Sequence, residues 1–344
     1  SVPKLLIPWI KASWTALPTL GKTEIILGTS LQENIGLDKQ FFKGVYQFDL
    51  RSSSKKRIQF KLIDLEFVNN RNLSNYFNVY RNSYDRLNQI AKNYNNNENI
   101  IDSSGSLLIP EGTSEFIEAV LNNRTNLNFE DEDFRIVNTV KERFDRLSAN
   151  NLILGSSFSL NLNSQESIFD EKFYQFRWKL DWVGNLLNQF LRSFSNAKNG
   201  NNQNTLGGVS PSQYIKTEID YIKHWPFGRE RVFAFHGFAG IAIPYGNSTN
   251  MPFSRSYFSG GANDNRAWKA YKLGPGSSSN INEFNEANFK IAFNLEYRFR
   301  ITGPLKGGLF IDSGNVWNIF DDVEDPDMSF DGLKDLSEIA IGSG

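Results

Sequence analysis

Residues 288–302 read NFKIAFNLEYRFRIT, and this stretch decides the fold. Apolar and polar residues alternate along it without a break. Successive side chains of a β-strand point to opposite faces of the sheet, so one face of this strand is apolar and the other carries ions. The apolar positions are Phe289, Ile291, Phe293, Leu295, Tyr297, Phe299 and Ile301. A half-buried strand of a soluble protein can alternate in this way. A run of this length, rich in aromatic residues, is more typical of a strand that faces lipid on one side and a polar lumen on the other.

The same alternation recurs along the chain. It is clear in residues 22–34, 44–52, 57–68, 151–163, 171–185 and 305–317, and weaker in residues 213–225. Residues 229–243, which are rich in small and aromatic residues, are also interpreted as a strand, and strand ends are expected at 1–10 and 336–344. In residues 57–68 the alternation changes phase, which indicates a β-bulge. The pattern predicts an all-β fold, an antiparallel transmembrane β-barrel, with about eleven strands or parts of strands present.

The connections between these strands are of two kinds. Short ones are expected after Ser52, Asn163, Trp225 and Ile301, and long ones at the other end of the strands, after residues 34, 68, 185, 243 and 317. Transmembrane barrels have short periplasmic turns and long external loops, so the split also predicts topology. The largest connection, residues 69–150, shows helical periodicity in 114–121 and 134–147. We expect it to be a partly helical extracellular insertion.

Two motifs near the C-terminal end are specific. The first is a loop that contains the pair Gly260-Gly261 and then Arg266-Ala267-Trp268, and the second is the strand segment 310–314, FIDSG. Together they resemble the BamA/TamA family of outer-membrane assembly factors, in which a Gly-Gly pair precedes an Arg-Gly-aromatic tip. Ala267 stands where the family has glycine. The segments 244–248 and 273–276, PYGNS and LGPG, look closest to the TamA-like lipoproteins of Bacteroidetes, TamL.

The resemblance implies a site. The family's loop folds into the barrel lumen, where its arginine meets an acid on the wall. Carried over, residues 244–287 form this signature loop and Arg266 pairs with Asp312, while Glu296 is a second acceptor. The bland alternative, a solvated arginine and a turn acid, is outweighed by the flanking motifs.

The resemblance also implies a function. It predicts an insertase of the Gram-negative cell outer membrane that is not an enzyme and needs no cofactor. Its partners would be client outer-membrane proteins, the lipid bilayer, and periplasmic or lipoprotein partners such as TamB-like or assembly-machine subunits. The alternative within the same superfamily is a two-partner-secretion translocator or a plugged channel.

Composition narrows the other possibilities. The 344 residues carry a net charge of −1, which gives no reason to expect a nucleic-acid partner, and they contain no cysteine and only two histidines, His224 and His236. No metal-ligand cluster, nucleophile elbow or complete phosphate-loop motif is present. The acidic run 321–327 could bind calcium, but an external loop is the better interpretation because the spacing does not fit an EF-hand.

The expected count of about eleven strands is lower than the roughly sixteen that the resemblance implies for a complete barrel. An open sheet in lipid leaves unpaired backbone groups, each of which costs several kcal/mol. We therefore expect residues 1–344 to be an incomplete outer-membrane barrel domain, with the periplasmic modules and the seam strands outside this sequence.

Overall fold

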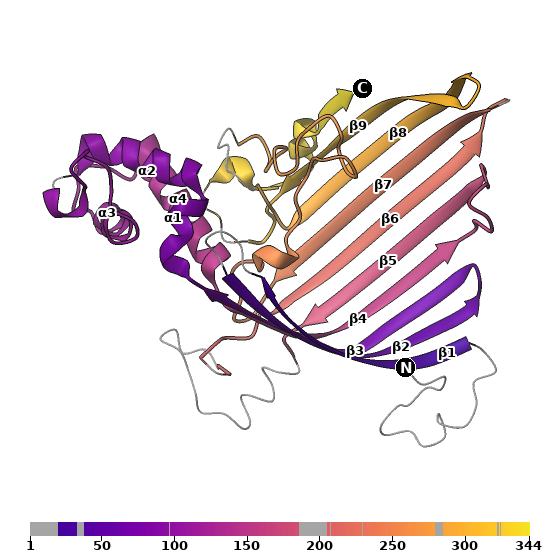
Figure 1. Cartoon of the computed structure of the whole chain (residues 1–344), viewed down its shortest axis with the longest axis horizontal. Coiled ribbons are helices and arrows are strands. Elements are labelled where there is room, and N and C mark those ends of the chain that lie inside the picture. The colour runs from indigo at the N-terminus through magenta and orange to yellow at the C-terminus, as the bar shows by residue number, and fades with distance from the viewer. Residues whose placement is uncertain are drawn as a thin grey trace.

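One antiparallel sheet of ten strands dominates the structure, a computed structural model (Figure 1). It describes residues 20–32, 38–95, 97–185, 205–206, 208–228, 230–278, 285–321, 323 and 325–344. Each strand pairs with its neighbours in the chain, in the order β1 to β10. The strands are β1 Leu20–Gln32, β2 Asp38–Ser53, β3 Lys56–Arg71, β4 Asn151–Asn163, β5 Phe173–Val183, β6 Tyr214–Pro226, β7 Arg231–Pro244, β8 Phe289–Thr302, β9 Leu305–Trp317 and β10 Ala340–Ser343.

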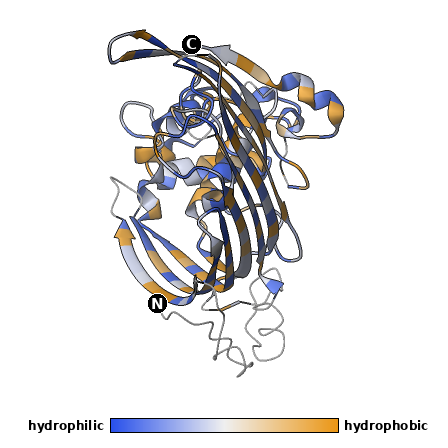
Figure 2. Ribbon diagram, turned by 90° about the vertical axis from the view of Figure 1, so that its right-hand side faces the viewer, coloured by the Kyte–Doolittle hydropathy of each residue, from blue (hydrophilic) through white to orange (hydrophobic). Residues whose placement is uncertain are grey.

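The two faces of the sheet are inverted relative to a soluble protein. The sheet is curved, and apolar and polar residues alternate along its strands (Figure 2). On the inner face, against which the signature loop packs, Lys290 and Asn294 are buried. On the outer face, the side chains of Phe293 and Leu295 are 43% and 40% exposed. This arrangement confirms the alternation predicted for residues 288–302. It is the arrangement expected of a sheet whose outer face contacts an apolar solvent and whose inner face lines a polar interior.

A β-bulge in β3 keeps the charged residues of that strand on the inner face. The register between β2 and β3 shifts where Tyr46 pairs with Ile63 and Gln47 with Lys61. The bulge was predicted from the phase change, and its effect is visible in the ion pair between Lys61 Nζ and Asp64 Oδ2, 2.8 Å apart. Without the extra residue, one of the two side chains would point to the outer face.

Two predicted strand limits are wrong. Strand β2 begins at Asp38 and not at residue 44, so the connection after β1 spans only residues 33–37 and is not long. The adjacent Phe41 and Phe42 hide the alternation there, but β3 is long enough to pair with the whole segment. At the other end, Leu333–Glu338 forms a 3-10 helix and only Ala340–Ser343 is strand. Asp335 starts that helix by accepting hydrogen bonds from the backbone amides of residues 331 and 332.

The strand count also differs from the prediction. The described residues form ten strands, and the eleventh, expected at residues 1–10, lies outside them. The connection after Asn163, expected to be short, runs over residues 164–172.

Between β3 and β4 the chain forms a helical insertion, as the periodicity of residues 69–150 predicted. Its α-helices are α1 Tyr76–Val79, α2 Arg81–Tyr94, α3 Glu111–Leu121 and α4 Glu132–Ser148. They lie at the same end of the sheet as the signature loop (Figure 1). The two ends of the insertion are held together, because Asn70 donates hydrogen bonds from its backbone to Asn150 Oδ1 at 2.7 Å and from its side chain to Ala149 O at 2.6 Å.

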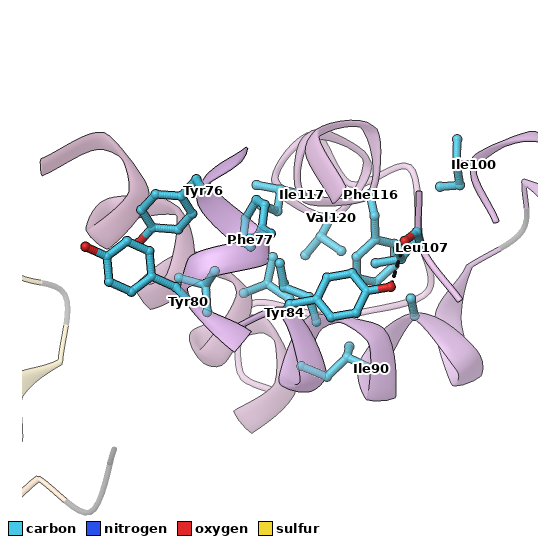
Figure 3. Close-up of a cluster of buried hydrophobic side chains, with 14 of the residues drawn as sticks. Tyr76, Phe77, Tyr80, Tyr84, Ile90, Ile100, Leu107, Phe116, Ile117 and Val120 are labelled. Carbon is cyan, nitrogen blue, oxygen red and sulfur yellow. Dashed lines mark hydrogen bonds between the residues drawn. The ribbon is translucent and has the colours of Figure 1, made fainter. Parts of the chain in front are cut away.

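The insertion has its own hydrophobic core (Figure 3). Tyr76, Leu87, Phe116 and Val120 are fully buried in it. The hydroxyl of Tyr84 donates a hydrogen bond to the carbonyl of Leu107 at 2.8 Å, and burial raises the pKa of this hydroxyl. A separate core means that the insertion packs as a unit of its own beside the sheet.

None of the helices in the described part of the chain is both long enough and apolar enough to cross a membrane.

Candidate functional site: the junction of the signature loop and the sheet

The signature loop, residues 244–287, leaves β7 and returns as β8. Its two arms pair with each other through bridges between Tyr257 and Ala287 and between Ser259 and Leu273. The loop is therefore a long irregular hairpin. Figure 1 shows it folded back over the strands β7 to β9 and not extended away from the sheet.

Two glycines make the turn at the start of the tip possible. Gly260 and Gly261 have φ angles of +99° and +103°, which side chains with a Cβ rarely adopt. A Cβ on Gly260 would also lie 2.2 Å from the carbonyl oxygen of Lys269. The turn is closed by Asp264, whose Oδ2 accepts a hydrogen bond from the amide of Gly260 at 2.8 Å. The Gly-Gly pair therefore allows a backbone conformation that residues with a side chain rarely adopt.

At the tip, Arg266 forms hydrogen bonds with Asp312 on β9. Its Nη2 donates to Asp312 Oδ1 at 2.8 Å and its Nε donates to Asp312 Oδ2 at 3.1 Å. The backbone amide of Arg266 donates to the same Oδ2 at 2.7 Å. Asp312 is fully buried, so one carboxylate fixes both the main chain and the side chain of the tip. Such charge-assisted, bidentate contacts define position as well as energy.

Glu296 on β8 is the second acceptor. It pairs with Nη1 of Arg266, and its other oxygen accepts a hydrogen bond from Arg298 Nε at 2.6 Å. The ring of Phe310 lies beneath the guanidinium, 3.9 Å from its central carbon to the ring centroid. The structure thus brings together the three charged residues singled out in the sequence, on one loop and two neighbouring strands.

Ala267 and Trp268 seat the tip against β10. An added Cβ on Gly342 would lie 2.3 Å from the Cβ of Ala267 and 2.9 Å from the ring of Trp268. Ala267 is not among the described residues with positive φ, so the glycine usual in the family is not needed for backbone conformation here. The space for the alanine methyl group comes from a glycine on the opposing strand.

Two strand residues make further contacts with the loop that were not predicted. Lys290 Nζ on β8 pairs with Asp264 Oδ1 at 2.7 Å and donates to the carbonyl of Phe258 at 2.7 Å. Asn294 Nδ2 donates to the carbonyl of Asp264 at 3.0 Å. Both strand residues lie on the polar parity of residues 288–302, which was the available signal. Asp264 carried no signal of its own, because its partners are distant in the sequence.

A cavity of about 350 Å³ lies beside the tip. Its lining includes Arg266, Glu296, His224 and His236. His236 approaches Asn294 Oδ1 at 3.0 Å and Asp220 Oδ2 at 3.4 Å.

Within the described ranges, His, Asp and Glu side chains form no group of three that could hold a metal ion. The acidic run 321–327 lies partly outside those ranges, and Asp325 uses its carboxylate to cap a 3-10 turn at residues 326–328.

Most of the chain is similar to known proteins. A family model described as Omp85 superfamily domain matches residues 47–344. The crystal structure of BamA from Haemophilus ducreyi lacking POTRA domains 1–3 is similar to the chain with 12% sequence identity and a TM-score of 0.47. That similarity covers 87% of this chain and 49% of the BamA chain, so the chain spans about half the length of that structure. No curated protein matches the chain. Since the family model covers most of its length, the chain belongs to the Omp85 superfamily.

Proposed function

We propose that this chain is the barrel portion of an outer-membrane insertase that assembles β-barrel or surface proteins. Membership of the Omp85 superfamily points to outer-membrane protein insertion or translocation in general. The apolar outer face and the polar inner face of β8 support a place in the lipid bilayer.

The junction between Arg266 and Asp312 is the observation that carries the more specific proposal. In this proposal the barrel offers a strand edge to a client protein, and client strands add to that edge by main-chain hydrogen bonding. A barrel that opens at a seam needs an internal support that does not depend on the seam. The signature loop is suited to this role because one carboxylate on β9 holds both its main chain and its arginine.

We assign the chain to the TamL-like lipoprotein branch within this function. The segments PYGNS at 244–248 and LGPG at 273–276 support the assignment. In the second segment Gly274 has a φ of +75°, and a Cβ there would lie 2.3 Å from Asn315 Oδ1, so the loop needs glycine at this position. TamB-like proteins or assembly-machine subunits are then the expected partners.

The second candidate is a translocator or plugged channel, which the cavities beside the loop favour. One of about 350 Å³ lies beside the tip, and another of about 440 Å³ lies between the loop and β6 to β8. An insertase has no need of a continuous aqueous path, whereas a translocator does.

Depletion of the full-length protein in its native host distinguishes the two candidates. An insertase predicts lower levels of many unrelated outer-membrane or surface proteins, and conductance in planar bilayers no higher than that of the lipid alone. Loss of a single exported protein, together with stable conductance, would establish the translocator and refute the proposal.

A further inference from the structure

The helical insertion contacts the signature loop at the base of its hairpin. The contact is made by Arg146, in the last turn of α4, just before the chain enters β4. The Nη1 of Arg146 lies 3.3 Å from Oε1 of Glu286, and Nη2 lies 3.3 Å from the other carboxylate oxygen. The same Nη2 donates to the carbonyl of Met251 at 3.4 Å.

These two partners belong to opposite arms of the loop. Met251 is on the outgoing arm and Glu286 is on the returning arm, next to the bridge between Tyr257 and Ala287. One guanidinium therefore spans the mouth of the hairpin. The side chains of Arg146 and Glu286 are only 14% and 11% exposed, so removing Arg146 leaves Glu286 largely buried without this partner. Arg146 itself has a second acidic neighbour, because its Nη2 also lies 3.9 Å from Oδ2 of the buried Asp321.

A second contact runs in the opposite direction, from the loop into the insertion. Phe253 of the loop packs against the hydrophobic core of the insertion, the core shown in Figure 3. Two residues further on, Arg255 Nη2 pairs with Glu66 Oε2 on β3 at 2.7 Å, and the carbonyl of Arg255 accepts from Lys216 Nζ on β6 at 2.8 Å. The turn at 253–255 thus joins the insertion, the loop and the inner face of the sheet.

We propose that the helical insertion acts as a clamp that positions the signature loop, with Arg146 as the principal positioning residue. The tip at Arg266 is held by the sheet, whereas the mouth of the hairpin is held by α4. The clamp adds a structural requirement to the proposed function. Its importance for assembly rests on that proposal, in which the loop must stay seated for assembly to proceed. A loop held at both the tip and the mouth can keep its place when strands at the seam separate.

Residues 1–344 contain no cysteine, which allows a direct test of loop seating. Ser259 lies in the hairpin beyond the clamp and is fully buried, so Ser259→Cys introduces one nearly isosteric and protected thiol into residues 1–344. Its rate of labelling by a hydrophilic maleimide, measured on the full-length protein in lipid vesicles, reports how often the loop opens. We expect Arg146→Ala to raise this rate about tenfold, as loss of a partly buried ion pair would.

Three controls make the result specific. Lys141→Ala removes an exposed ion pair with Asp145 on the same helix and should leave the Ser259→Cys rate unchanged. Ser83→Cys places a separate reporter in the buried face of α2, and its labelling should not respond to Arg146→Ala. Glu286→Gln breaks the same contact from the loop side, so it should accelerate labelling by itself but add little to Arg146→Ala.

An unchanged Ser259→Cys rate in Arg146→Ala would overturn the clamp. So would full additivity of Arg146→Ala and Glu286→Gln, or an equal acceleration of the Ser83→Cys reporter, which would mean that the insertion had melted. Because the readout is independent of assembly, failure of the proposed function is visible separately: a loosened loop with normal assembly would refute the bracing role and leave the clamp intact.

Discussion

Asp312 is buried and receives three hydrogen bonds from one residue, Arg266, so this pair dominates at the residue scale. We expect Arg266→Glu to destabilise the seated loop by about 3 kcal/mol, because a buried carboxylate then faces a second one. Asp312→Arg combined with it should restore part of the loss. Urea midpoints of the refolded barrel in detergent, arranged as a double-mutant cycle, measure the coupling, and simple additivity would contradict the pair.

The close approach of Ala267 to Gly342 gives a second residue-scale prediction. Gly342→Ala should displace the tip and cost about 1–3 kcal/mol, the usual range for overpacking. Ala267→Gly placed with it should recover most of that cost, because it removes the methyl group in the way. Gly28→Ala on β1 is the matched control, since an added Cβ there meets nothing within 4 Å. Trypsin cleavage of the loop after Arg266 measures displacement, and equal resistance of Gly342→Ala and the parent chain would count against the contact.

At the scale of the element, the two faces of the strands differ in what they tolerate. Leu295 on β8 lies on the outer face, whereas Ile222 on β6 lines the interior cavity beside the tip. A lysine facing lipid near the middle of the membrane costs about 2–4 kcal/mol, but one facing a wet lumen costs far less. Leu295→Lys should therefore reduce folding into lipid vesicles strongly and Ile222→Lys only slightly. Heat-modifiable migration on gels measures the folded fraction, and equal losses would contradict the assignment of the faces.

The elements also show how a local irregularity preserves a global pattern. The bulge in β3 lets Lys61 and Asp64 share the inner face although they are three residues apart. A regular strand would send one of them to the opposite face. The phase change in residues 57–68 therefore keeps the charged side chains of this strand on the inner face of the sheet.

At the scale of the whole molecule, the outer face should meet lipid and the inner face should not. Trp182 is 56% exposed on the sheet and Trp317 is fully buried. In vesicles of brominated lipid, we expect Trp182→Phe to reduce the fraction of fluorescence that the lipid quenches. Trp317→Phe removes a buried tryptophan, so the fraction of the remaining tryptophan fluorescence that the lipid quenches should stay the same or rise. Steady-state fluorescence in brominated and plain vesicles measures both, and a lipid-insensitive Trp182 would contradict the orientation of the sheet.

Much of the fold was predictable because strand periodicity is local. Each alternating segment specifies its two faces without reference to the others, and eight of the ten observed strands overlap a segment identified by its alternation. The ninth, β7, overlaps residues 229–243, which were identified by their small and aromatic residues. The tenth, β10, was expected to begin at residue 336, where the structure has a 3-10 helix. The start of β2 was missed because Phe41 and Phe42 are adjacent and interrupt the alternation. The start of β10 was missed because Asp335 accepts hydrogen bonds from backbone amides and begins a 3-10 helix.

The candidate site was only partly predictable. Arg266, Asp312 and Glu296 were found through a resemblance of motifs, not through periodicity. Lys290 and Asn294 were visible as inward polar residues, but their contacts with the loop near Asp264 were not. No property of residue 264 in the sequence identifies a partner 26 residues away.

By itself the sequence determined the strands, their two faces, the helical character of residues 69–150 and the motifs of the signature loop. Only the tertiary structure decided where the loop lies and what holds it. Arg146 and Glu286 are 140 residues apart, and Arg255 and Glu66 are 189 apart. The reason is physical: the direction of a side chain along a strand follows from the two-residue repeat of its own backbone, whereas an ion pair across the interior depends on how every intervening element packs.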